Sequence, residues 1–230
     1  MLDPEVVIPR PNQQQDIFSK RLVLPDEVYI LGSGINGRAY HDCIPDECYL
    51  ISLNRAICIT PCSLWMQKTT DPSYISEPWF TEALKCPDPK AFGWELTSRV
   101  RNVNIAYTFW HEPDYWKEPS PFDFIYGLLR EGGTIAGMAL QLCYWKGVKR
   151  VVLCGIDMKG HTHWDEQGGS VRGTVPLNEC LDYNADKVID GIDQEWGREL
   201  QMLQLMVDMC KASGMTIQSL SETALEVERL

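Results

Sequence analysis

Residues 131–157 constrain the fold more than any other part of the chain. Apolar residues recur at helical spacing from 135 to 143, and Gly147 ends that pattern. The run 148–154 follows at once, is rich in valine and is too short for a second helix, which is typical of a buried strand. A helix that leads directly into a buried strand is the second half of a βαβ unit, so this segment predicts a parallel sheet.

Strand and helix patterns alternate along the rest of the chain. This alternation predicts the α/β class with a mainly parallel sheet. The expected strands lie at residues 28–31, 48–53, 63–66, 103–109, 148–154 and 215–220, and the expected helices at 77–84, 135–143 and 196–210.

The length and local composition predict one domain with an arm and a lid. Residues 1–24 hold several prolines and three consecutive glutamines, so we expect an extended arm that wraps its own domain or a partner subunit, which leaves a homo-oligomer open. Residues 25–230 are expected to form a single domain. Within it, residues 159–186 are glycine-rich and show no helical period, which predicts a functional lid.

The charge and cysteine content exclude several classes of protein. The net charge of −11 disfavours nucleic acids and anionic membranes as partners, because phosphates are repelled over most of the surface. No apolar run is long enough to span a bilayer. The nine cysteines form no CxxC pair and follow no cleavable leader, which indicates reduced thiols in a cytoplasmic protein. The set available for a zinc site has spacing that matches no usual ligand pattern: Cys43, Cys48, Cys58 and Cys62.

Three glycine-containing turns are candidates for a ligand site, which in open parallel sheets lies at the carboxyl ends of the strands. They are Gly32-Ser33-Gly34, Gly132-Gly133-Thr134 and Gly155-Ile156-Asp157, and the turns of Ser33 and Asp157 should meet over one edge of the sheet. Free N–H groups in such turns and at helix N-termini attract anions, so the turns predict a phosphate site. Ordinary loop chemistry explains the same glycines equally well, since glycine is common at helix ends.

Residues 32–37 also match the G-x-G-x-x-G pattern of dinucleotide-binding folds. That interpretation requires a full crossover helix and an acidic residue about 20 positions further on. Here Pro45 shortens the helix, and Asn54 stands at the end of the next strand. An arginine such as Arg55 can hold the 2′-phosphate of NADP, so an NADP-dependent oxidoreductase stays as a minor alternative.

Four blocks of the sequence belong together in one comparison: VYILGSGING, SLNRA, TTDPS and TIAGMALQLCYWKGVKRVVLCGID. Taken together, they resemble the nucleotide-binding core of the family 42 sialyltransferases. The blocks are also similar to a related set that includes motility accessory factors and an archaeal hydroxymethylpterin pyrophosphokinase. The resemblance covers about 100 residues between Val28 and Asp157. It implies a modified Rossmann-like glycosyltransferase sheet with helices on both faces and a cytidine monophosphate (CMP) sugar as donor, bound without metal.

The resemblance implies roles for individual residues. Ser33 and Gly34 would lie against the donor phosphate, and Asn54 would hold the nucleotide. Ser33 and Asp71 stand where the family has asparagine, and Asp157 closes the shared Gly-Ile-Asp. The implied nucleotide-binding set is Gly32, Ser33, Gly34, Asn54, Asp71, Ser73, Gly133, Thr134 and Gly155.

Two departures from the family concern the chemistry. Lys159 replaces a family tyrosine, and no histidine follows His163 to match the family's downstream general base. A lid histidine near neutral pKa can remove a proton from an acceptor hydroxyl, which makes His161 and His163 candidates for the general base. Asp157, the last residue of the shared Gly-Ile-Asp, is the third candidate catalytic residue. With Asp165 the two histidines also form a candidate metal set, although the chain has no Asp-x-Asp. Two solvated loop histidines explain the pattern as well.

These features predict a transferase that moves a sugar from a CMP-type donor to an acceptor hydroxyl. Its partner is a nucleotide or nucleotide sugar, and it requires no metal or other cofactor. One alternative is a Mg²⁺-dependent pyrophosphokinase of the hydroxymethylpterin type, with Asp71 and Asp157 as the carboxylates near the phosphates. The other is a nucleotide-binding protein without catalysis, which Lys159 favours.

Overall fold

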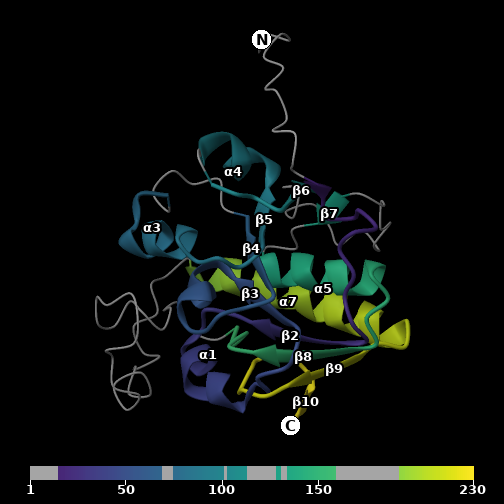
Figure 1. The fold of residues 1–230 in the computed structure, drawn as a ribbon. Helices are drawn as coiled ribbons and strands as arrows, with labels where there is room; N and C mark the ends of the chain where they lie inside the picture. The colour runs from purple at the N-terminus through teal and green to yellow at the C-terminus, as the bar shows by residue number, and fades with distance from the viewer. Residues whose placement is uncertain (1–14, 69–74, 101–102, 113–127, 131–133, 159–191) are drawn as a thin grey trace.

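The computed structural model of the chain describes residues 15–68, 75–100, 103–112, 128–130, 134–158 and 192–230. They form one sheet with helices against both faces (Figure 1). The strands are β1 (Gln15–Asp16), β2 (Glu27–Leu31), β3 (Leu50–Leu53), β4 (Leu64–Gln67), β5 (Lys90–Gly93), β6 (Tyr107–Glu112), β7 (Leu128–Arg130), β8 (Arg150–Cys154), β9 (Thr216–Ser219) and β10 (Glu228–Arg229). The helices are α1 (Ile35–Tyr40), η1 (His41–Cys43), η2 (Asn54–Cys58), α3 (Pro78–Leu84), α4 (Trp94–Arg99), α5 (Ile135–Trp145) and α7 (Ile192–Ala212).

The sheet is parallel throughout its described pairings. Its strands follow the order β1-β6-β5-β4-β3-β2-β8-β9-β10, and β7 pairs with β6. The predicted α/β class with a mainly parallel sheet is therefore confirmed. From β2 the sheet grows through β3, β4 and β5 to β6 on one side, and the chain later adds β8 and β9 on the other side. The strand order thus reverses between β2 and β8.

Alternating side chains of β2 separate the cores on the two faces of the sheet. Val28 and Ile30 are fully buried in the largest cluster, together with side chains of α5 and α7. These two helices lie side by side across that face (Figure 1). Residues 135–143 of α5 are all buried, because the helix is covered by β2, β3 and β4 on one side and by α7 on another. A helix in that position is apolar all round rather than along one stripe.

The opposite face carries a second core built from aromatic rings. Trp65 of β4 meets Phe92 of β5 edge-on, with ring centroids 5.0 Å apart, and Phe80 of α3 completes the group. Such edge-to-face contacts add to the free energy gained from apolar burial. The aromatic core includes side chains of β4 and β5 and therefore packs these two strands against α3.

Strand β5 and helix α4 were not predicted from the sequence. Lys90 opens β5 and Gly93 closes it, and both residue types are uncommon in strands. Lys90 is nevertheless buried, and its Nζ donates to the carbonyl oxygens of Cys86 at 2.6 Å and Asp88 at 3.2 Å. Burial lowers the pKa of this ammonium group. These two carbonyl oxygens satisfy the ammonium group of Lys90 inside the protein. No local sequence pattern predicts that they lie within reach.

Residues 15–24, predicted as part of an extended arm, pack onto their own domain. Strand β1 pairs with β6 through Gln15 opposite Tyr107 and Asp16 opposite Thr108. The side chains buried behind it in the main core are Ile17, Phe18, Leu22 and Leu24. Residues 1–14 of the predicted arm lie outside the described residues.

Replacing Ile17 tests whether this segment stabilises the fold. Ile17 is 0% exposed, whereas Val23 in the same segment is 73% exposed. We expect Ile17→Ala to lower the free energy of unfolding by about 2 to 4 kcal/mol, because it leaves a cavity in the core. The matched control Val23→Ala should change it by less than about 0.5 kcal/mol. Urea unfolding monitored by tryptophan fluorescence measures both, and equal effects would contradict the packing of the segment.

Candidate functional site

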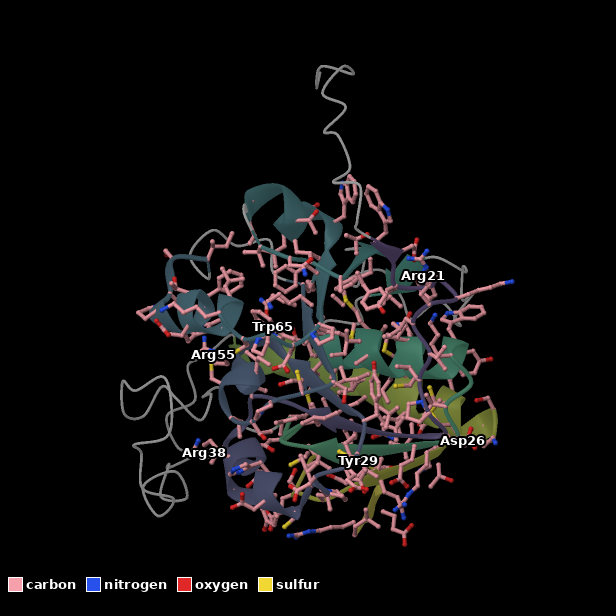
Figure 2. The ribbon with its side chains drawn as sticks, in the orientation of Figure 1. Arg21, Asp26, Tyr29, Arg38, Arg55 and Trp65 are labelled. Carbon is pink, nitrogen blue, oxygen red and sulfur yellow. The ribbon has the colours of Figure 1, made fainter. Side chains whose placement is uncertain are left out.

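The reversal of strand order places two turns against each other at the carboxyl edge of the sheet. Leu31 of β2 lies opposite Cys154 of β8, and each strand then enters a glycine turn. In open α/β sheets this crevice outside the strand ends is where ligands bind. Figure 2 shows Arg38, in the helix after β2, and Asp26, just before β2, at opposite ends of the molecule, so the two ends of β2 are well separated.

The two turns are joined by backbone hydrogen bonds. Gly32 N donates to Cys154 O at 2.8 Å, and Gly34 N donates to Gly155 O at 3.0 Å. Gly155 adopts a φ of +67°, and a Cβ atom there would overlap the backbone of Gly37. Only glycine combines that conformation with such a close approach. The expected meeting of the first and third glycine turns is therefore present in the structure.

The carboxylate of Asp157, which follows β8, lies at the N-terminus of α1. The residue is 8% exposed, and its Oδ2 accepts a hydrogen bond from Asn36 N at 3.0 Å. A Cβ atom on Gly34 would overlap the same carboxylate. A carboxylate at this position satisfies a free N–H and interacts favourably with the helix dipole. Asp157 therefore acts as the cap of α1, and its predicted catalytic role stays a prediction.

The turn after β8 is also supported from the segment that follows β9. Gly155 N donates to Ser221 Oγ at 2.9 Å, and Thr223 Oγ1 donates to Ile156 O at 2.6 Å. Ala224 N donates to Asp157 O at 2.9 Å. The sequence prediction missed Ser221 and Thr223 as supporting residues. Their signal was present, because both are small polar residues directly after a strand that ends at the same edge.

Asn54 stands at the end of β3 in a conformation that asparagine tolerates. Its φ is +49°, in the left-handed region where Asn is enriched among non-glycine residues. Its carbonyl oxygen accepts a hydrogen bond from Trp65 Nε1 at 2.8 Å, which anchors the turn to the aromatic core. The side chain is partly exposed at the edge. This is the position at which the resemblance implies a nucleotide contact.

Arg55 lies in the interior rather than at the edge. It is 5% exposed, its Nη2 lies 3.5 Å from Glu77 Oε2, and its guanidinium group lies 5.3 Å from the ring centroid of Trp79. An arginine held by a carboxylate and an aromatic face is not available to a 2′-phosphate. Helix α1 is also only six residues long. Both observations disfavour the NADP alternative.

Thr134 caps α5 at the same edge. Helix α5 precedes β8 and runs opposite to the strands, so its N-terminus lies at their carboxyl ends. Thr134 Oγ1 accepts a hydrogen bond from Gly137 N at 3.1 Å. The predicted residues Gly32, Ser33, Gly34, Asn54, Thr134, Gly155 and Asp157 therefore all stand at one edge of the sheet. His161, His163, Asp71, Ser73 and Gly133 lie outside the described residues.

Lys68 is a basic residue at this edge that the sequence analysis did not single out. It follows β4 directly and is partly buried. Burial lowers its pKa to about 8, while the charge of Glu199 on α7 acts in the opposite direction. Desolvation therefore outweighs the attraction between the two charges. The signal available in the sequence was a lysine directly after a predicted buried strand.

Cysteine chemistry and metal binding find no support among the described residues. Burial raises the pKa of the Cys154 and Cys210 thiols to about 12, which keeps them protonated. Within the described ranges, no three His, Cys, Asp or Glu side chains come together as metal ligands. The described helices include none with the length and apolar character of a bilayer span.

Comparison with known proteins identifies the fold. No family model matches the sequence, and no curated protein matches it. Among solved structures, the chain is similar to the MAf glycosyltransferase from Magnetospirillum magneticum AMB-1, with a TM-score of 0.60 and 14% identity over 94% of this chain. The chain has a glycosyltransferase fold. It spans 35% of the length of that protein.

A second solved structure is also similar. It is the monofunctional alpha-2,3-sialyltransferase Cst-I from Campylobacter jejuni, with a TM-score of 0.45 and 10% identity, over 91% of this chain and 84% of that one. The expected Rossmann-like glycosyltransferase sheet with helices on both faces is confirmed by the topology and by the first comparison.

Two glycine substitutions test the joining of the turns. Gly155 and Gly147 share a positive φ, +67° and +75°, but a Cβ on Gly147 would meet nothing within 4 Å. We expect Gly147→Ala to lower the free energy of unfolding by about 1 kcal/mol, the cost of the left-handed conformation alone. Gly155→Ala should lower it by at least about 2 kcal/mol more, because the added methyl overlaps the backbone of Gly37. Equal losses in chemical unfolding would contradict the close contact.

The lowered pKa of Lys68 predicts how stability depends on pH. Its pKa falls from 10.5 to about 8 on folding, so between these values the unfolded chain binds more protons. The stability of the wild type relative to Lys68→Met should rise as the pH increases from about 8 to 10.5, by at most about 3 kcal/mol. Thermal unfolding across this range measures the difference. The control Lys20→Met removes an exposed lysine, and an identical profile for both variants would contradict the prediction.

Proposed function

We propose that the protein is a glycosyltransferase that moves a sugar from a CMP-type donor to an acceptor hydroxyl without a metal ion. The observation that carries the proposal is the fold, which 94% of the chain shares with a glycosyltransferase at a TM-score of 0.60. The CMP donor is supported by the resemblance of the strand-end blocks to the family 42 sialyltransferases. The meeting of the glycine turns at the reversal of strand order supports a nucleotide site at that edge.

The position of Asp157 bears on where the donor phosphate binds. Its carboxylate already satisfies Asn36 N at the start of α1, and two anions at one helix N-terminus repel each other. The longer helix α5, capped by Thr134, starts at the same edge and offers N–H groups without a described carboxylate in contact. The proposed phosphate position is therefore nearer to Thr134 than to Gly34, with Ser33 as a polar neighbour.

The proposed chemistry follows from ordinary glycosyl transfer. The anomeric bond to the phosphate breaks, negative charge accumulates on the departing CMP, and N–H groups aimed at the phosphate stabilise that charge. The acceptor hydroxyl attacks the anomeric carbon and loses its proton to a general base. The lid histidines His161 and His163 remain the candidates for this base, on the strength of the sequence alone.

No observation favours the pyrophosphokinase alternative. It requires Asp71 and Asp157 to hold Mg²⁺ beside the phosphates. Asp157 is buried to 8% exposure and its Oδ2 accepts a backbone hydrogen bond, whereas Mg²⁺ prefers carboxylates that share it with several waters. The remaining alternative is a nucleotide-binding protein without catalysis. Measuring turnover of the sugar nucleotide distinguishes it from the proposed transferase, because only the transferase releases CMP.

Binding of CMP and release of CMP from CMP-sialic acid test the proposal. We expect CMP to bind in the presence of EDTA, as measured by titration calorimetry. Asn54→Gly removes the carboxamide but keeps a residue suited to a φ of +49°. It should weaken CMP binding at least about tenfold, the equivalent of about 1.4 kcal/mol. His161→Ala combined with His163→Ala should slow CMP release without a comparable loss of CMP affinity.

The control for Asn54→Gly is Asn104→Ala, an exposed asparagine that precedes β6 at the opposite edge of the sheet. The CMP affinity of Asn104→Ala should equal that of the wild type. ATP binding that appears only with Mg²⁺ would support the pyrophosphokinase instead. CMP binding without any release of CMP from the sugar nucleotide, in the presence of acceptor hydroxyls, would support a binding protein that has lost catalysis.

A further inference from the structure

The last residue of β4 carries an unpaired carboxamide in the protein interior. Gln67 is 0% exposed. Neither its Oε1 nor its Nε2 has a hydrogen-bond partner among the described residues. Burying an amide in this state costs roughly 1 to 3 kcal/mol, and native proteins retain few such groups. Gln67 therefore requires an explanation other than stability.

The sheet places Gln67 beside the proposed nucleotide site. The register that pairs Leu53 with Met66 puts Asn54 and Gln67 next to each other at the ends of β3 and β4. On its other side Gln67 lies opposite Phe92 of β5. Leu64 and Met66 belong to the main core, so Gln67 alternates to the face that carries the aromatic core. The carboxamide thus stands at the inner border of the candidate site.

The surroundings of Gln67 would accept an apolar side chain. Its neighbours on this face are Trp65, whose indole N–H already donates to Asn54 O, and Phe92, whose ring has no hydrogen-bonding group. Methionine has nearly the same length and volume and no hydrogen bonds to lose. A carboxamide at this position lowers the stability of the free protein and provides one donor and one acceptor side by side.

We propose that Gln67 determines substrate specificity at the site, forming hydrogen bonds with the sugar nucleotide together with Asn54. Rotation about the three side-chain torsions of Gln67 brings the amide toward the edge, where a substrate group supplies the missing partners. The matching chemistry is an adjacent donor and acceptor, which the edge of cytosine and a pair of sugar hydroxyls both present. This inference rests on the proposed function and adds a recognition residue to it.

The test combines stability with affinity in Gln67→Met. Removing a buried unpaired amide should raise the midpoint of thermal unfolding, while removing its bonds to substrate should weaken CMP-sialic acid binding at least about tenfold. If Gln67 had only a structural role, its replacement would lower the stability of the protein. A variant that is more stable but binds CMP-sialic acid more weakly therefore supports a role in recognition. Gln67→Leu repeats the measurement with a second apolar side chain in case the methionine variant fails to fold.

The matched control is Ser52→Ala. Ser52 is also 0% exposed with an unpaired Oγ, but it lies opposite Trp65 and two residues before Asn54, about 7 Å further from the edge. Its substitution should leave the affinity for CMP-sialic acid unchanged. If Ser52→Ala weakens binding as much as Gln67→Met does, the effect is not specific to Gln67 and the inference fails.

Two probes identify the group that Gln67 recognises. An equal loss of affinity for CMP and for CMP-sialic acid places the contact on the cytosine edge, and a loss for CMP-sialic acid alone places it on the sugar. Wild-type affinity in Gln67→Met, or a lower unfolding midpoint, overturns the inference while leaving the proposed function intact. A wild-type protein that binds neither probe overturns both.

Discussion

The contact between the turn after β2 and the turn after β8 is the constraint on which the site depends. Gly32 and Gly34 donate to backbone oxygens of the β8 end, and Gly155 adopts a left-handed φ against Gly37. Because side chains are absent at these glycines, the two strand ends approach at backbone distance. That approach brings Asp157 to the start of α1 and aligns the edge on which Asn54, Gln67 and Thr134 stand.

The same contact affects which helix N-terminus at this edge can bind an anion. A glycine turn before a helix is normally a place for a phosphate, yet here Asp157 supplies the negative charge to α1 from within the protein. This is why the proposed position of the substrate phosphate is the start of α5. At the same edge, Asn54 follows β3 and Gln67 ends β4; the first side chain is partly exposed, and the second is buried with no hydrogen-bond partner among the described residues. In the proposed site, the phosphate and the polar groups of the substrate therefore meet different strand ends.

The main elements of the fold were predictable because their patterns are local. The apolar run of α5, Gly147 after it and the valine-rich β8 predicted a βαβ half, and the structure has these elements at residues 135–145 and 150–154. The elements that were missed depend on distant partners. Lys90 enters β5 because carbonyl oxygens satisfy its ammonium group, and β1 exists because β6 offers it a free edge. Neither condition is visible in neighbouring residues.

The sequence by itself determined the α/β class, the glycine turns and the set of polar residues that follow strands, because periodicity and turn chemistry act over a few positions. Only the tertiary structure decided what those residues do. Asp157 accepts a hydrogen bond from Asn36 N in the first turn of α1, 121 positions away in the chain, and Arg55 turns inward to Glu77 and Trp79. It also showed that the amide of Gln67 has no hydrogen-bond partner within the described part of the chain, which is a property of the packed interior and not of any local pattern.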